Sequence, residues 1–255
     1  MGYLISAHTD IGIKKKTNQD SVLLQVAQTS IGDVAFGVIC VGMGGLAKGE
    51  LASATLIKAF ADWFQNDFPN MLKRGFTESE LNSRWKNLIL IQARNIMDYG
   101  ESNGISLGTT AVAILLMNNR YYVVNVGDSR AYQINSTLNQ ITIDQTFIQR
   151  EMDLGHMTMK EAMKDPRRNV LLQCVGASDY IEPDFFSGDV YPEDVYMLCS
   201  DGFRHIITPE EIYQYLNPGA LLSENNMLEN SRYLTDLNKY RMENDNISVA
   251  LIKVH

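Results

Sequence analysis

Four aspartates flank strand-like segments, where side chains from distant parts of the chain can meet. Asp128 and Asp201 each follow an apolar run, and Asp20 and Asp245 each precede one. Carboxylates that gather at one edge of a sheet repel one another unless cations lie among them. Because ligation by oxygen alone selects hard ions, this pattern favours magnesium or manganese over zinc.

A simpler explanation exists for each acidic pair, because Asp-Gly and Asp-Asn are common turn formers. The four aspartates together favour a shared site over four separate turns. A glycine-dense stretch at 42–45 follows an apolar strand and precedes a helix. Such a stretch either brings the backbone close to a ligand or makes a plain strand-to-helix turn.

The hydrophobic pattern predicts the elements that must position these residues. Asn118 and Asn119 predict a tight turn between two strands. Thr208, followed by Pro209, predicts the start of a helix. The remaining expected elements are strands at 34–40, 109–117, 120–126, 195–199 and 248–254, and helices at 50–65, 77–99 and 225–242. The predicted hairpins, together with an antiparallel pair of helices at 50–65 and 77–99, indicate a mixed α/β fold whose sheet is largely antiparallel.

Composition narrows the function classes. The 255 residues are 45% hydrophobic and 20% charged, which is typical of a soluble globular protein, and we expect one domain over 1–255. The net charge of −8 disfavours a nucleic-acid partner. No apolar run reaches the about 18 residues that a membrane helix needs. The three cysteines are an odd number without CxxC spacing, which fits a reducing compartment better than a disulfide framework. We expect a cytoplasmic monomer with no membrane partner.

Nine short motifs, in this order, resemble those of the metal-dependent serine/threonine protein phosphatases of type 2C, particularly the compact bacterial ones. The similarity extends from about residue 7 to 254. The motifs are TDIG at 9–12, NQDS at 18–21, GMGG at 42–45, GELAS at 49–53, GTT at 108–110, VGDSRAY at 126–132, PRRNVL at 166–171, CSDGF at 199–203 and DNISV at 245–249.

The resemblance implies an α+β fold, an α/β/β/α sandwich of two mainly antiparallel sheets flanked by helical layers. It also implies a site for two Mn²⁺ or Mg²⁺ ions at one end of the sandwich. In such sites a metal-activated water attacks the phosphorus of a phosphoserine or phosphothreonine. The implied partners are phosphorylated proteins and a cognate serine/threonine kinase.

The resemblance also assigns roles to individual residues. It implies that Asp201 and Asp245 hold the second metal and that Asp20 acts through a metal-bound water. It implies that the backbone carbonyl of Gly42 contacts the first metal, and that Asp128 matches the acid linked to a third, weaker metal.

Val41 is the departure from the family pattern that matters most. It stands where the family has the aspartate that bridges both catalytic metals. Valine continues the strand before it but supplies no ligand, so the first metal site is weakened. We therefore expect the fold to survive and catalysis to be impaired.

Two other positions depart from the family pattern. Lys15 stands where the family has a phosphate-binding arginine, and lysine offers a point charge in place of a two-pronged clamp. We expect two of the three lysines at 14–16 to lie in a solvated loop. His205 replaces a common Asp or Asn, and we expect a surface histidine at a helix start rather than a metal ligand.

The polar segment 145–165 predicts short surface helices. From the residues alone it is either a lid over the site or a surface excursion. It matches the family's flap, which favours the lid and places substrate preference there.

Three functions remain open at this point. The first is a phosphoserine/phosphothreonine protein phosphatase with impaired activity. The second is an inactive pseudophosphatase that binds phosphoproteins or a kinase as a regulatory module. The third, ranked last, is a hydrolase of small phosphoesters.

Overall fold

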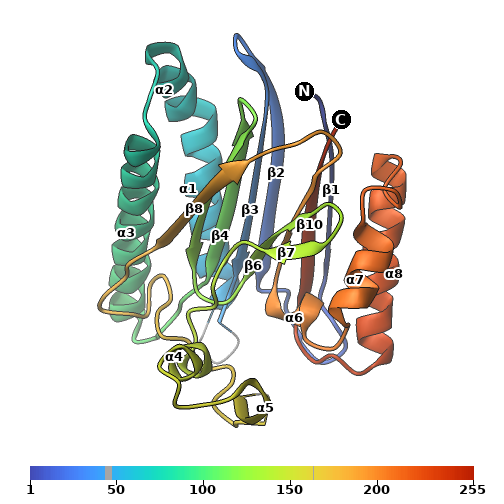
Figure 1. Ribbon diagram of the computed structural model, residues 1–255. Helices are drawn as coiled ribbons and strands as arrows, with labels where there is room; N and C mark the ends of the chain where they lie inside the picture. The colour runs from blue at the N-terminus through green and yellow to red at the C-terminus, as the bar shows by residue number, and fades with distance from the viewer. Residues whose placement is uncertain (44–47, 163) are drawn as a thin grey trace.

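The computed structural model describes residues 1–43, 48–162 and 164–255. Within these ranges, ten strands form two five-stranded sheets that stack face to face, and every strand pairing in them is antiparallel. Helices cover the outer face of each sheet, as Figure 1 shows. This arrangement confirms the predicted α+β sandwich of two antiparallel sheets between helical layers.

Each sheet combines strands from separate parts of the chain. In spatial order the first sheet contains β1 (Tyr3–Asp10), β10 (Ile247–Val254), β9 (Val195–Cys199), β6 (Arg130–Ile134) and β7 (Leu138–Gln140). The second contains β2 (Asp20–Thr29), β3 (Gly32–Val41), β4 (Ala111–Met117), β5 (Arg120–Val126) and β8 (Asp184–Asp189). Both chain termini belong to the first sheet, where β1 pairs with β10.

The alternation of side chains along β3 shows why its sequence is almost continuously apolar. Phe36 and Val38 pack toward the helices, whereas Ala35 and Ile39 pack toward the other sheet. Successive side chains of a strand point to opposite faces, and both faces of this strand are covered. The strand therefore anchors its last residue, Val41, at the end of a segment that is buried on both faces.

Helices α1 (Gly49–Asp62), α2 (Phe68–Arg74) and α3 (Glu78–Asn103) cover the second sheet. A π-helical turn, η1 (Trp63–Asp67), joins α1 to α2. Aromatic rings fill this layer: the Phe36 ring centroid lies 5.5 Å from that of Trp63 and 6.2 Å from that of Trp85. Thr77 caps α3, since its side chain accepts a hydrogen bond from the Glu80 amide.

Helices α7 (Pro209–Leu216) and α8 (Glu224–Tyr240) cover the first sheet. Thr208 and Glu211 form a full capping box, in which each side chain accepts from the other residue's backbone amide. This result confirms the predicted helix start at Thr208.

Three short helices lie near one end of the sandwich: α4 (Phe147–Asp153), α5 (Met159–Ala162) and α6 (Asp201–Arg204). The first two confirm the predicted short helices in 145–165, of which Met163 lies outside the described residues. None of the helices in the described part of the chain combines the length and apolar character needed to cross a membrane.

Some predicted boundaries were wrong. The expected helix at 50–65 ends as an α-helix at Asp62 and continues as the π-helical turn. The expected strand at 109–117 begins at Ala111, because Thr109 instead bridges Gly42 and Val175. The predicted turn at 118–119 is confirmed, with φ angles of 50° and 59° at the two asparagines.

Candidate functional site

The strand ends bring the four predicted aspartates to one end of the sandwich. Asp20 is the first residue of β2, and Asp128 lies in the connection from β5 to β6, which passes from one sheet to the other. Asp201 begins α6 directly after β9, and Asp245 precedes β10. A cavity of about 230 Å³ lies at this end, and its walls include Lys15, Val41, Gly42, Asp128, Asp201 and Asp245.

Asp20 is buried, and only one of its two carboxylate oxygens accepts a hydrogen bond from the part of the chain that the structure describes. Its Oδ2 accepts a hydrogen bond of 2.7 Å from Ser248, whereas its Oδ1 has no partner among the described residues. Burial, and then the charges of Asp201 and Asp245, raise the pKa of Asp20 to about 7. A buried carboxylate oxygen without a donor is suited to a cation or a cation-bound water.

Asp128 resembles Asp20 in its electrostatics. Its side chain is 15% exposed. Burial, and then the charge of Asp201, raise the pKa of Asp128 to about 7, and Arg204 opposes the rise. The raised pKa values show that Asp20, Asp128, Asp201 and Asp245 form one interacting group.

Lys15 lies inside this acidic group. Its Nζ is 2.6 Å from the Asp245 carboxylate, whereas Lys14 and Lys16 are exposed, as expected. Glu243 fixes the Asp245 loop, because its Oε1 accepts from the Asp245 amide at 3.0 Å. The amino-terminal loop therefore supplies a cation to the carboxyl-terminal loop.

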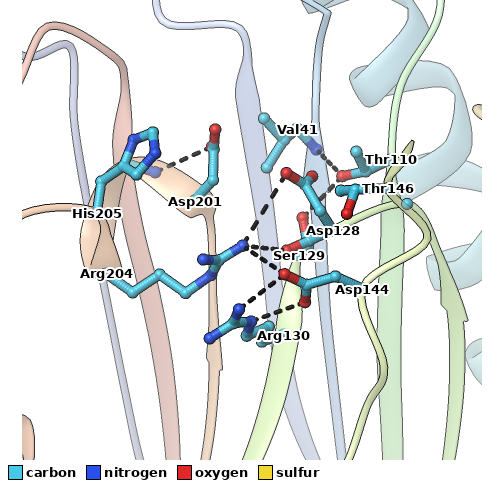
Figure 2. Close-up of polar contacts among 12 residues, drawn as sticks. Val41, Thr110, Asp128, Ser129, Arg130, Asp144, Thr146, Asp201, Arg204 and His205 are labelled. Atoms are coloured by element: carbon cyan, nitrogen blue, oxygen red, sulfur yellow. Dashed lines mark hydrogen bonds and ion pairs between the residues drawn. The ribbon is translucent and has the colours of Figure 1, made fainter. Parts of the chain in front are cut away.

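Val41 ends β3 directly opposite Asp20 in the strand register. The Val41 amide donates to Thr110 Oγ1 at 3.2 Å, and the Val41 carbonyl accepts from the Thr110 amide at 2.9 Å and from the Thr109 hydroxyl at 3.1 Å. Figure 2 shows the Val41 methyl groups projecting toward the space between Asp128 and Asp201. An apolar side chain thus faces the centre of the acidic group.

Gly42 lies at a close approach of two backbone segments. Its amide donates to the Gln19 carbonyl at 3.0 Å. A Cβ at this position would lie 2.4 Å from the carbonyl carbon and oxygen of Gly49, so a larger residue cannot fit. Gly44 and Gly45, the rest of the predicted glycine cluster, lie outside the described residues.

The sequence reasoning missed an arginine network beside Asp128. Arg130 holds both oxygens of Asp144, at 2.7 Å each. Arg204 Nη2 donates to the Asp128 carbonyl at 2.8 Å and lies 3.4 Å from Asp144 Oδ2 and 4.0 Å from Asp128 Oδ2. Figure 2 shows Arg204 reaching across from α6 toward both carboxylates. No spacing in the sequence connects these residues, since Arg204 and Asp144 are 60 positions apart.

The prediction for His205 is confirmed in one part and wrong in the other. His205 is exposed, as expected, but it follows the end of the four-residue helix α6 instead of starting a helix. Its Nδ1 lies 3.7 Å from Glu243 Oε2. The buried strand β9 leads directly into α6, which turns the chain inward and places His205 in a cavity wall.

That second cavity, of about 590 Å³, lies between the acidic group and helices α4 and α5. The Phe147 ring of α4 lies under two guanidinium groups, 5.2 Å from that of Arg150 and 4.2 Å from that of Arg167. Arg150 belongs to α4 itself, whereas Arg167 joins α4 to the segment that follows α5, where the Phe147 amide also donates to the Val170 carbonyl at 2.8 Å.

The donor set fits a divalent cation only in part. In 1–43, 48–162 and 164–255, no three acidic, histidine or cysteine side chains are arranged as ligands of one ion. The unpartnered Oδ1 of Asp20 and the nearby carboxylates of Asp201 and Asp245 supply oxygen donors of the kind that a hard ion prefers, but their spacing in this structure does not form a complete set of ligands. At the position of Val41 the donor set does not fit, because that side chain offers no oxygen.

Comparison with known proteins adds a family and a fold. Residues 14–146 match the family model described as Protein phosphatase 2C. The chain is 30% identical over 221 residues to the serine/threonine phosphatase stp of Listeria welshimeri, covering 85% of this chain and 83% of that protein.

Two solved structures are similar along nearly the whole chain. The S. agalactiae serine/threonine phosphatase has a TM-score of 0.84 and 27% identity, with all of both chains covered. The catalytic domain of the phosphatase PstP, in complex with two manganese ions, has a TM-score of 0.79 and 27% identity, with 99% of both chains covered.

Proposed function

This chain belongs to the protein phosphatase 2C family of serine/threonine protein phosphatases, and we propose that Val41 impairs its hydrolysis of phosphorylated proteins. The observation that carries this proposal is the position of Val41. It lies opposite Asp20 in the strand register and lines the same cavity as Asp128 and Asp201. A carboxylate at that point could join ligands from both sheets, and an isopropyl group cannot.

We propose that Asp201 and Asp245 hold one Mn²⁺ or Mg²⁺ ion and that Asp20 reaches it through a bound water. The two manganese ions of the PstP complex and the unpartnered Oδ1 of Asp20 support this assignment. Such an ion supplies Lewis-acid charge and lowers the pKa of its water. We also propose that the Gly42 carbonyl contacts the first ion, whose site is weakened. Asp128 is proposed to bind a third ion.

Lys15 is proposed to bind the substrate phosphate as a point charge. Its pairing with Asp245 at 2.6 Å keeps its ammonium group at the cavity wall. A phosphate must compete with Asp245 for this ammonium group, so phosphate affinity depends on a cation that engages Asp245 in its place.

Further proposals concern the setting of this activity. We propose one phosphatase-like domain over 1–255, with a flap around 145–165 that selects the phosphoprotein. We also propose a cytoplasmic, monomeric protein in a signalling role with a serine/threonine kinase. The three cysteines are free and buried, which agrees with a reducing compartment.

The second candidate is an inactive pseudophosphatase that binds phosphoproteins or a kinase. The observation that favours it is the occupation of the acidic group by the chain's own side chains, Val41 and Lys15. Calorimetric binding of a phosphothreonine peptide with and without Mn²⁺ separates the binding modes. Binding that is unaffected by Mn²⁺ and by Lys15→Ala indicates a scaffold that does not recognise phosphate.

The test of the proposed function is dephosphorylation of a phosphothreonine peptide in millimolar Mn²⁺ by the natural chain, Val41→Asp and Val41→Asn. We expect Val41→Asp to raise kcat/KM by about 100-fold or more, since it restores a charged ligand. Val41→Asn is the control, because asparagine has the shape and polarity of aspartate without its charge. Its kcat/KM should remain close to that of the natural chain. Equal, robust activity in all three proteins contradicts the proposed role of Val41.

A further inference from the structure

Arg204 carries a positive charge into a part of the site that the proposed function assigns to an ion. Its side chain is 13% exposed and extends from α6 between Asp128 and Asp144. Its Nε is buried without a hydrogen-bond acceptor among the described residues. A buried, partly unsatisfied guanidinium is unfavourable unless nearby carboxylates offset the cost.

Asp144 fixes the position of this charge. Both of its oxygens are taken by Arg130 in a two-pronged pair at 2.7 Å, and its Oδ2 also lies 3.4 Å from Arg204 Nη2. Arg130 is held in turn by Tyr132, whose hydroxyl accepts from Nη1 at 3.0 Å. The contacts therefore run from Arg130 to Asp144, from Asp144 to Arg204 and from Arg204 to Asp128. Arg204 is held in position by this network and lies next to Asp128.

Charge balance shows what this network does to ion binding. Asp20, Asp128, Asp144, Asp201 and Asp245 carry five negative charges when ionised. Lys15, Arg130 and Arg204 offset three of them through the contacts described above. Glu243 adds a further carboxylate to the wall of the larger cavity. Arg204 removes, beside Asp128 itself, part of the negative charge that would attract a second divalent ion.

We propose that Arg204 is a resident cation that takes the place of a divalent ion at Asp128, so that this acidic site binds one divalent ion. The proposal rests on the proposed function in one respect, since that single ion is the one assigned to Asp201 and Asp245. It replaces the third ion proposed above for Asp128 with the Arg204 guanidinium. Arg204 acts through Asp128 and is a positioning residue for the acidic group.

The test is a calorimetric titration with MnCl₂ of the natural chain and three variants: Arg204→Gln, Arg204→Lys and Arg94→Gln. Arg94 is exposed on α3 and serves as the matched control for loss of an arginine. We expect one Mn²⁺ per natural chain. Arg204→Gln should bind a second ion at Mn²⁺ concentrations at which the natural chain binds only one. Arg204→Lys keeps the charge and should again bind one ion.

A second readout is the unfolding temperature in EDTA. Arg204→Gln should unfold at a lower temperature than the natural chain, and Mn²⁺ should restore more of its stability than it adds to Arg94→Gln. A purely structural arginine would lower the unfolding temperature without changing the number of ions bound.

Several results overturn the proposal. These are a natural chain that binds no ion or binds two or more, and an Arg204→Gln variant that folds and binds only one. If Arg204→Gln does not fold, the ion count of the natural chain and of Arg204→Lys decides. The proposed function fails separately: an inactive Val41→Asp variant contradicts that function and leaves the ion count of Arg204 variants unchanged.

Discussion

Asp20 shows how one buried carboxylate links pH to stability in this protein. Its Oδ1 has no partner among the described residues, and its pKa is raised to about 7 by burial and by Asp201 and Asp245. The folded chain thus holds this proton more tightly than the unfolded chain, whose Asp pKa is about 3.9. The resulting stability is fully present below pH of about 4 and is lost as the pH rises through about 7.

We therefore expect Asp20→Asn to stabilise the metal-free protein at high pH. Asparagine keeps the shape and an oxygen for Ser248 but carries no buried charge. In EDTA at about pH 8 the free energy of unfolding should rise by on the order of 2–4 kcal/mol, and at about pH 5 the gain should be smaller. Urea unfolding at both pH values measures it. A gain that is equal at both pH values would falsify the electrostatic explanation.

At the level of residues, the aspartates could be predicted and the arginine network could not. Asp20, Asp128, Asp201 and Asp245 each flank an apolar strand, so the pattern of one segment is enough to place each. Arg204 depends on Asp144, 60 positions away in sequence. No periodicity connects such residues, because only the packing of β6 against β9 brings their segments together.

Helix α4 shows how an element is held beside the site. Few of its contacts are apolar, and none of its residues is buried. The Phe147 ring lies 4.2 Å from the Arg167 guanidinium and 5.2 Å from that of Arg150. Cation–π contacts of this kind are worth about 0.5–2 kcal/mol each, which is a large share of what holds a short surface helix.

Phe147→Ala should therefore loosen this segment without unfolding the sandwich. We expect cleavage within 147–162 by a low dose of protease to become about threefold faster or more, while the unfolding temperature changes little. Phe147→Tyr is the matched control, because it retains an aromatic face for both guanidinium groups. Unchanged cleavage in Phe147→Ala would show that other contacts hold α4.

The junction between α1 and α2 shows where hydrophobic periodicity fails for an element. A helix over 50–65 fits a period of 3.6 residues, but the chain forms a π-helical turn at Trp63–Asp67. This turn lets Phe64 stack on Phe36 with ring centroids 4.9 Å apart and lets Phe68 stack on Phe64 at 5.4 Å. The packing of these aromatic rings determines the π-helical turn. The sequence of the helix alone does not predict that turn.

At the scale of the whole molecule, the acidic group joins the two sheets. Asp20 begins a strand of the second sheet, whereas Asp201 and Asp245 flank strands of the first. Direct links already cross at this point, since Ser248 of β10 donates to Asp20 and the Gln19 amide donates to Asn246. An ion bound among these carboxylates would tie both layers of the sandwich together.

Manganese should therefore stabilise the protein as a unit. A ligand that binds only the folded state at about 100 times its Kd adds about 2.7 kcal/mol, which for a chain of this size raises Tm by about 5–10 °C. Differential scanning calorimetry at neutral pH, with EDTA and then with excess Mn²⁺, measures the shift. A single transition that moves as a whole is expected, because the ligands come from both sheets.

The control for this experiment separates the acidic group from weak surface binding. Asp245→Asn removes a proposed ligand and also releases Lys15 from its ion pair, so the Mn²⁺ shift should largely vanish. Asp98→Asn removes an exposed aspartate of α3 and should keep the full shift. If both variants respond to Mn²⁺ like the natural chain, the stabilising ion binds elsewhere. If only Asp245→Asn loses the response, the ion that couples the two sheets lies at the end of the sandwich where Lys15, Val41 and Arg204 meet.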